Sequence, residues 1–201
     1  MPTAENASAS RSEEILSVAQ NFIQSRGYNG FSYRDIAAEI GIKSASIHYH
    51  FPTKGDLGKA VTARYTEQFG KQLQRIEASA DTAHERLKKY ATLFRDTLIE
   101  RHLLCMCGML AGDIETLPEL VKLEVAHFFE AQQQWLTGVI TTGKTTGEIS
   151  PAITAAAWAT TLLAALEGAM LVSRGLDQND QFDIVTDALL SSLFKSSKTN
   201  S

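Results

Sequence analysis

The 201-residue sequence has only two cysteines, four prolines and two tryptophans, and it lacks an uninterrupted apolar run of about eighteen residues. Two thiols cannot complete a four-ligand zinc site, and in a reducing cytoplasm they are not expected to form a structural disulfide. Thr160, Glu167 and Gly168 interrupt the most apolar stretch, so we expect no membrane span. The first eleven residues have neither a basic start nor an apolar segment, so we expect no secretory signal and a cytoplasmic protein.

The motifs of the common enzyme classes are also missing. The sequence contains no HExxH, no GxSxG and no phosphate-binding glycine loop, and its five histidines do not follow a metal-site spacing. His48 and His50 are two residues apart and therefore lie on different faces of a helix, which is a poor arrangement for binding one metal ion. We expect no enzymatic activity, no metal and no cofactor.

What is present is the composition of a soluble globular protein, with 44% apolar and 21% charged residues, which excludes disordered and collagen-like classes. The charge is spread unevenly. Residues 1–112 carry 14 basic and 12 acidic side chains, whereas residues 113–187 carry 3 basic and 11 acidic ones. This asymmetry favours an N-terminal part that approaches a polyanion and a C-terminal part that a polyanion repels.

The stretch from Phe31 to Leu57, FSYRDIAAEIGIKSASIHYHFPTKGDL, has the layout of a helix-turn-helix. Ser32 is a good N-cap for the first helix, and Gly41 can take the left-handed conformation that a sharp turn requires. A second helix of about seven residues follows and ends at Pro52. This helix offers hydroxyls, imidazoles and a phenol but no carboxylate, which suits a surface that approaches phosphates.

Three segments of this stretch, RDIA at 34–37, GI at 41–42 and SIHYHFPTK at 46–54, resemble the DNA-binding domain of the TetR (tetracycline repressor)/AcrR family. The resemblance covers roughly the first quarter of the chain, and the remainder is similar to the family in length and helical character. At His48, where members of the family most often have tyrosine, the sequence departs from the pattern. An imidazole can donate, accept or carry charge, so this position leaves the operator sequence open.

The resemblance implies an all-α protein of about nine helices. A three-helix N-terminal helix-turn-helix domain is expected over residues 11–54, and a larger helical bundle for ligand binding and dimerisation over residues 55–196. The polar ends at 1–10 and 197–201 are expected to be disordered.

Apolar periodicity predicts the other helices near residues 11–26, 53–78, 82–99, 117–143, 151–174 and 178–195. A short helix is predicted within residues 101–120, and a loop over TTGKTTGEIS at 141–150. The helix from residue 54 to 78 would be on the order of 35 Å long, enough to link the DNA-binding end with the ligand domain.

By the same resemblance the protein is expected to be a homodimeric repressor whose second helices enter successive major grooves of a palindromic, double-stranded operator. The side chains expected to contact phosphates are Ser32, Tyr33, Arg34, Tyr49 and Lys54, and those expected to meet base edges are Lys43, Ser44, Ser46, His48 and His50. The expected DNA-binding residues are Ser32, Tyr33, Arg34, Lys43, Ser44, Ala45, Ser46, His48, Tyr49, His50 and Lys54.

A pocket for a small-molecule effector is implied among the later helices. The candidate lining residues are Tyr90, Phe94, Cys105, Met109, His127, Phe128, Trp135, Trp158 and Leu162. Their mostly apolar character favours an uncharged or weakly polar effector.

The last two helices are more apolar than the surface of a monomer requires, which predicts a four-helix bundle between two chains. The expected interface residues are Trp158, Leu162, Leu166, Met170, Val185, Leu189 and Leu193. Burial of these side chains within their own chain is the alternative interpretation.

The segment Cys105–Met106–Cys107 leaves further hypotheses open. Both cysteines suit a helical core as small apolar residues. Alternatively, a thiolate stabilised by Arg101 or His102 senses an oxidant or electrophile and releases DNA. Two other classes remain: a helical protein-interaction module without DNA binding, and an enzyme with one of these cysteines as nucleophile.

Overall fold

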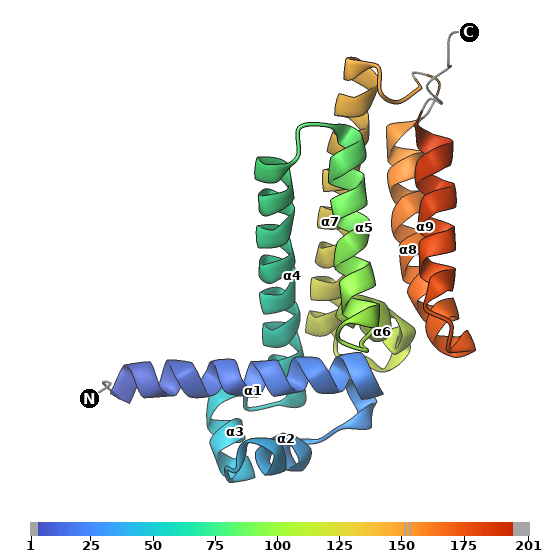
Figure 1. The fold of residues 1–201 in the computed structure, drawn as a ribbon. Helices are drawn as coiled ribbons and strands as arrows, with labels where there is room; N and C mark the ends of the chain where they lie inside the picture. Colours follow the sequence, from blue (N-terminus) through green and yellow to red (C-terminus); the bar gives the residue numbers. More distant parts are fainter. Residues whose placement is uncertain (1–3, 151, 153, 195–201) are drawn as a thin grey trace, which may run out of the picture. The chain divides into compact units, whose positions relative to one another are not determined.

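The computed structural model describes residues 4–150, 152 and 154–194, and this part of the chain contains nine α-helices and no strand (Figure 1). The all-α prediction is therefore confirmed. Two short 3-10 turns lie at Tyr28–Gly30 and Ile114–Thr116. The helices are α1 (Ala4–Arg26), α2 (Tyr33–Ile40), α3 (Ser44–His50), α4 (Lys54–Ser79), α5 (Ala83–Ile99), α6 (Met106–Gly112), α7 (Glu119–Thr146), α8 (Ala155–Leu176) and α9 (Asp180–Leu193).

The chain divides into two compact units that differ from the predicted domains. Unit 1 comprises residues 1–68 and 106–128, and unit 2 comprises residues 69–105 and 129–201. α4 and α7 each contribute residues to both units. The segment from α6 to the first part of α7, which the sequence assigned to the ligand domain, therefore belongs to the unit that contains the helix-turn-helix.

Several helix ends differ from the predictions. α1 begins at Ala4 rather than near Arg11, because the alanines among residues 4–10 have a high helix propensity and continue the helix in the N-terminal direction. α7 continues through the predicted loop to Thr146 and ends at Gly147, whose φ of 81° is left-handed. The predicted start at Pro151 and the tail at 197–201 lie outside the described residues.

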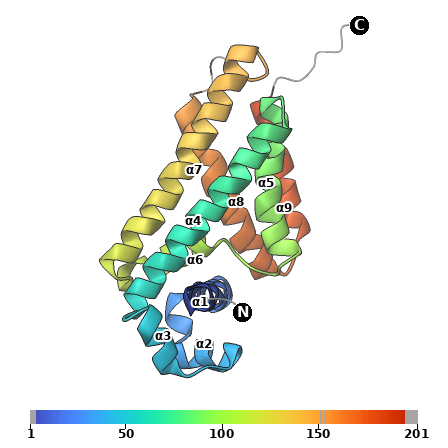
Figure 2. The ribbon, with the colours of Figure 1, turned by 90° about the vertical axis from the view of Figure 1, so that its left-hand side faces the viewer.

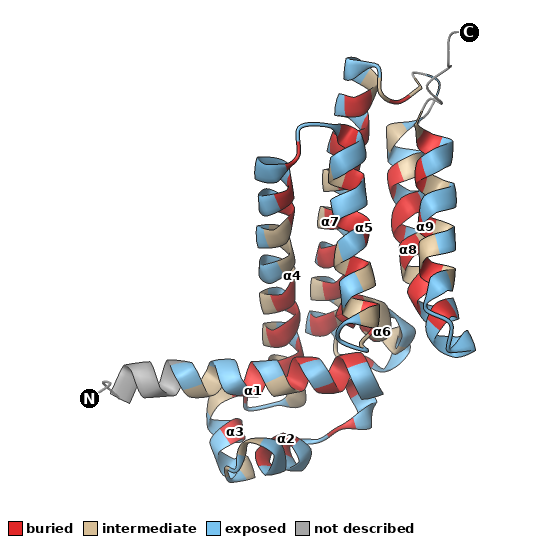
Figure 3. Cartoon of the chain, in the orientation of Figure 1, coloured by how far each residue is buried: buried red, intermediate tan, exposed pale blue. Residues whose placement is uncertain are grey.

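Unit 1 is built around the buried face of α1 (Figure 3). Ile15 and Ile23 on this helix are fully buried, as are Ile36 of α2 and Ile47 of α3. The predicted apolar stripe of the first helix therefore supports the helix-turn-helix pair, and α1 packs directly on α2.

In unit 2, α5, α8 and α9 pack against one another, and the views in Figures 1 and 2 agree on this arrangement. An aromatic cluster fills the interior. The Tyr90 ring is stacked on Trp135, with 5.4 Å between ring centroids, and Phe69 and Phe94 lie against its other sides. Leu162 and Leu166 of α8 are buried in the same unit.

The structure corrects the predicted dimer residues. Leu162, Leu166, Met170 and Leu193 are at most 2% exposed in the single chain, so they are core residues of unit 2. Helical periodicity identified the apolar positions, but it could not distinguish the face that packs inside the chain from the face that remains outside. Trp158, Val185 and Leu189 keep part of their surface exposed. The large apolar residues that are more than half exposed on α8 and α9 are Leu171, Val172, Leu176 and Ile184.

α8 meets the length and composition criteria for a membrane span, although Thr160, Glu167 and Gly168 interrupt its apolar stretch. A third of its most apolar window is buried inside the chain. Core helices of soluble proteins meet the same criterion, and α8 packs against both α5 and α9. These contacts account for the buried third of that window, whereas Leu171, Val172 and Leu176 stay exposed in the single chain.

Two glycines inside α4 provide a stability test. A Cβ at Gly58 would lie 2.8 Å from Val121 and 2.9 Å from the Tyr28 ring, whereas a Cβ at Gly70 would contact nothing within 4 Å. We expect Gly58→Ala to lower the free energy of unfolding by about 1–3 kcal/mol through overpacking. The control Gly70→Ala should raise it by up to about 1 kcal/mol, because alanine favours the helix. Urea denaturation measures both, and a stabilised Gly58→Ala would contradict the packing of unit 1.

Candidate functional site

The first helix of the DNA-binding pair is held by a capping box. The Ser32 backbone N–H and hydroxyl both donate to Oδ2 of Asp35, each at 2.7 Å. These hydrogen bonds lower the pKa of the Asp35 carboxyl. At the other end, Gly41 has φ 69° and ψ 34°, as predicted for the turn. Asp35 was not among the predicted site residues, although the Ser-x-x-Asp spacing signals this cap.

α3 presents a polar face without a carboxylate. Ile47 is fully buried and fixes the helix to the core, while the side chains around it are exposed. Tyr49 is 81% exposed, the largest value among the exposed large hydrophobic residues. The exposed residues are Lys43, Ala45, Ser46, His48 and Tyr49, and Ser44 and His50 are partly exposed. The predicted base-contacting residues therefore lie together on one surface.

His48 has a defined tautomer in its neutral form. Its Nδ1 lies 3.3 Å from the Pro52 carbonyl oxygen, and its ring centroid lies 4.6 Å from that of Tyr33. Because a carbonyl only accepts, the hydrogen bond assigns the proton to Nδ1. Nε2 then remains as an acceptor for an amino group on a base edge.

The structure corrects the role of Tyr33, which was predicted to contact phosphate. Tyr33 is 9% exposed, and its hydroxyl shares one proton between the carbonyl oxygens of Phe51, at 2.8 Å, and Thr53, at 2.6 Å. Burial, with a contribution from Asp56, raises the pKa of this phenol. Tyr33 therefore fixes the segment after α3 and does not offer a free hydroxyl.

Lys54 also has internal partners. Its Nζ donates to the Phe31 carbonyl oxygen and lies 4.3 Å from the centre of the Phe31 ring and 4.8 Å from that of Tyr28. Burial lowers the pKa of this amine, against the effect of Asp35 and Asp113. Lys54 thus contributes positive potential to the surface, but its ammonium group is held in place by unit 1.

A cleft of about 650 Å³ lies beside these residues in unit 1. It is lined by Phe31, Ser32, Tyr33, Arg34, Ser44, His48 and Lys54. Arg34 is exposed, so a phosphate at this cleft would meet one accessible guanidinium and the partly buried ammonium of Lys54. All but Phe31 were predicted DNA-binding residues.

Comparison with known proteins agrees with this geometry. Residues 15–61 match the model for bacterial regulatory proteins of the tetR family, and residues 83–189 match that for the tetracyclin repressor-like C-terminal domain. The chain belongs to the TetR family. It is a DNA-binding transcriptional regulator that responds to a ligand.

Individual relatives support the same family. A TetR-family regulator from Agrobacterium tumefaciens superposes with a TM-score of 0.90 at 33% identity, over 94% of this chain and all of that one. One from Legionella pneumophila has a TM-score of 0.82 at 31% identity, over 96% of this chain and 98% of that one. The transcriptional repressor DhaR of a Mycobacterium species is 28% identical over 83% of this chain and 86% of its own length.

The candidate ligand residues are divided between the two units. Tyr90, Phe94, Cys105, Trp135, Trp158 and Leu162 belong to unit 2, whereas Met109, His127 and Phe128 belong to unit 1. His127 is exposed, so it does not line an interior site. Periodicity placed it on an inward face of its helix, but α7 turns that position towards solvent.

Glu167 was not among the predicted site residues. It lies on α8, and its Oε1 is buried without a hydrogen-bond partner, although other atoms of the residue are exposed. Burial raises the pKa of this carboxyl to about 7, and a hydrogen bond from the Cys105 thiol opposes the shift. The isolated Glu in an apolar helix is the signal in the sequence that could have identified it.

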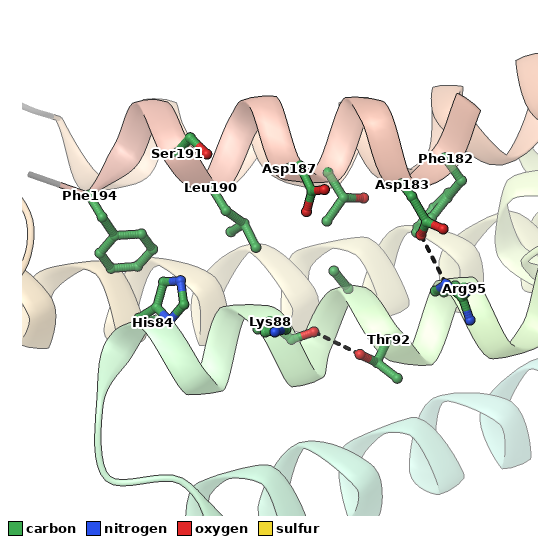
Figure 4. Close-up of a pocket in the computed structure, with 12 residues that line it drawn as sticks. His84, Lys88, Thr92, Arg95, Phe182, Asp183, Asp187, Leu190, Ser191 and Phe194 are labelled. Carbon is green, nitrogen blue, oxygen red and sulfur yellow. Dashed lines mark hydrogen bonds and ion pairs between the residues drawn. The ribbon is translucent and has the colours of Figure 1, made fainter. Parts of the chain in front are cut away.

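Unit 2 has a recess of its own, which lies between α5 and α9 and has a volume of about 560 Å³ (Figure 4). Arg95 and Asp183 form an ion pair at 2.9 Å, and the rings of His84 and Phe194 meet edge to face. The charge of Asp183 is therefore already balanced within the protein. Among the described residues, no group of three His, Cys, Asp or Glu side chains is arranged to hold a metal ion.

The Glu167 carboxyl should make stability depend on pH. Its pKa is about 7 in the folded chain and near 4.5 in the unfolded chain, so the folded state binds the proton more tightly. This contribution is complete below pH 4.5 and is lost as pH rises to about 7, by on the order of 2 kcal/mol.

Denaturant unfolding of the wild type and of Glu167→Gln across this range isolates the effect. The difference between the two free energies should change with pH in the stated direction. A difference that stays constant from pH 4.5 to 7 would show that Glu167 is not buried.

Proposed function

We propose that this protein is a repressor that binds a palindromic operator as a homodimer and leaves the DNA when a small molecule binds in unit 2. The observation that carries the proposal is the exposed, carboxylate-free face of α3, which follows a left-handed Gly41 in a family of DNA-binding regulators. The relative DhaR is described as a transcriptional repressor, which supports repression as the direction of control. Operator binding would place the protein in the cytoplasm.

In this proposal the exposed residues of α3 have separate roles. Lys43, Ser46 and His48 meet base edges in the major groove, and Ser44, Ala45 and His50 line the same surface. Arg34 and Tyr49 contact phosphates, while Lys54 adds positive potential from its held position and Ser32, whose two donors bind Asp35, caps α2.

The dimer would form through the apolar surface that unit 2 leaves uncovered on α8 and α9. Leu171, Val172, Leu176 and Ile184 are each 54–57% exposed, which is unusual for so many large apolar side chains on two neighbouring helices. Pairing this surface with a second copy would produce the intermolecular four-helix bundle expected from the sequence, through different residues.

The effector signal would reach the helix-turn-helix along the chain itself. α4 and α7 each contribute residues to both units, and residues 105 and 106 are the third point at which the chain passes between them. A shift of α4 in one subunit changes the spacing of the two recognition helices, and affinity for a site with fixed spacing falls.

Selection of bound duplexes from a random pool tests the proposal. We expect a palindromic sequence whose half-sites are about one helical turn apart, bound with an affinity that falls steeply as salt rises. Absence of salt-dependent binding to any duplex would refute it and favour the protein-interaction alternative.

Two substitutions should separate affinity from specificity. We expect Arg34→Ala to weaken selected and unrelated duplexes alike and to reduce the salt slope by about one ion. His48→Ala should instead relax the preference at one base pair, by about 1–3 kcal/mol. Lys88→Ala removes the same charge from the recess of unit 2 and should leave both properties unchanged. An unaltered sequence preference in His48→Ala would show that another side chain reads the base.

The dimer surface has its own test. Ile184→Asp places a charge in the proposed interface and should yield monomers in light scattering at micromolar concentration, with a loss of operator binding. Leu123→Asp is a matched control, because Leu123 is 63% exposed in unit 1. A dimeric Ile184→Asp variant would exclude this surface.

A further inference from the structure

We propose that the effector is an organic amine whose ammonium group binds the Glu167 carboxylate inside unit 2, next to the stacked rings of Tyr90 and Trp135. The inference rests on the proposed function only in treating the bound molecule as the effector. It replaces the expectation of an uncharged or weakly polar ligand, which came from the mostly apolar candidate residues.

Several side-chain oxygen atoms are buried in unit 2 without hydrogen-bond partners among the described residues. Among these are Oε1 of Glu167, Oε1 of Gln132 and the hydroxyl of Tyr90. Tyr90 and Gln132 are 0% and 1% exposed as whole residues. Carboxylate and amide oxygens only accept hydrogen bonds, and a phenol can accept one, so these atoms call for a donor.

These atoms come from helices that meet in one part of unit 2. Gln132 precedes Trp135 by three residues on α7, so the two lie on one helix face. Trp135 stacks on Tyr90 of α5, at an interplanar angle of 24°. Burial raises the pKa of the Tyr90 phenol. Glu167 and Cys105 are close enough to this phenol to raise its pKa further.

Among the described residues, no basic side chain is found to act on the Glu167 carboxyl. Its surroundings act on it through burial and the Cys105 thiol. Every described lysine and arginine of unit 2 is exposed or partly exposed. Asp183, on the neighbouring helix α9, is paired with Arg95. The interior carboxylate therefore lacks the positive partner that its surface counterpart has, and a ligand can supply it.

The aromatic rings beside this carboxylate suit the same ligand. Tyr90 and Trp135 are aromatic groups whose ring faces carry negative potential, which attracts an ammonium group. A primary or secondary amine also brings the N–H donors that the unpartnered oxygens require. A carboxylate ligand, in contrast, would be repelled by Glu167.

The Cys105 thiol provides a link to the DNA-binding unit. It donates a hydrogen bond to Glu167, and the next residue, Met106, is the first of α6 and of the second segment of unit 1. Just after α6, Asp113 accepts a hydrogen bond of 2.8 Å from the Tyr28 N–H. An ammonium group that takes the place of the thiol at Glu167 would therefore act on the residue that leads directly into α6.

Matched amine and alcohol probes test the proposal. The pairs are 2-phenylethylamine with 2-phenylethanol, 3-phenylpropylamine with 3-phenylpropanol, and butylamine with butanol, each titrated into the full chain by calorimetry. Members of a pair have the same shape, but only the amine is charged at neutral pH. We expect at least one amine to bind wild type tenfold or more tightly than its alcohol.

Variants locate the binding site. Glu167→Gln keeps the side-chain volume and should lose the preference for the amine, whereas Asp187→Asn removes a carboxylate from the recess between α5 and α9 and should keep it. Circular dichroism establishes that both variants are folded. Equal binding of amine and alcohol by wild type, no binding of any amine, or a preference that survives in Glu167→Gln would each overturn the inference.

A second measurement separates this inference from the proposed function. The binding amine is added to the complex of wild type with its selected duplex, and we expect release at saturating amine. Cys105→Ser should change the amine concentration needed for release by several fold, whereas Cys107→Ser, a buried thiol of unit 1, should not. A wild type that prefers the amine but binds no duplex defeats the proposed function alone. A duplex complex unaffected by bound amine overturns the amine as effector.

Discussion

The hydrogen bonds of Tyr28 hold three segments of unit 1 together. Its hydroxyl donates to the Lys54 carbonyl oxygen at 2.9 Å, where α4 begins, and its N–H donates to Asp113, just after α6. Burial raises the pKa of the phenol to about 12, so the hydroxyl keeps its proton under all physiological conditions. A Cβ at Gly58 would collide with the same ring. Tyr28 therefore determines how α4 and the α6 segment approach the helix-turn-helix.

This arrangement explains why residues 106–128 belong to unit 1. The Asp113 carboxylate accepts from the Tyr28 N–H, and the Thr116 hydroxyl accepts from the Asn29 side chain at 2.7 Å. The segment brings four acidic residues and one basic residue into this unit, so the slight basic excess of residues 1–112 does not extend to the unit as a whole. Cationic contacts to DNA would then come from individual side chains, Arg34, Lys43 and Lys54, around the carboxylate-free α3.

The helix-turn-helix could be predicted from sequence because its signals are local. Ser32, Gly41 and Pro52 each act on the backbone within a few residues, and the structure has the cap and the left-handed turn where expected. Contacts distant in sequence were not predictable in the same way. Tyr33 was expected to face phosphate, yet its hydroxyl binds carbonyl oxygens 18 and 20 residues away. Four of the seven predicted dimer residues are buried within the chain for a similar reason, because periodicity does not show which apolar face a neighbouring helix covers.

By itself, the sequence determined the all-α fold, the recognition helix and the family, because capping, turn and periodicity signals act over short distances. Only the tertiary structure decided which polar groups have partners. Lys54 is held by a carbonyl oxygen and two rings, whereas Oε1 of Glu167 is buried without a hydrogen-bond partner among the described residues. The physical reason is that the energy of a charge depends on the solvent and dipoles around it, and these come from segments distant in the chain.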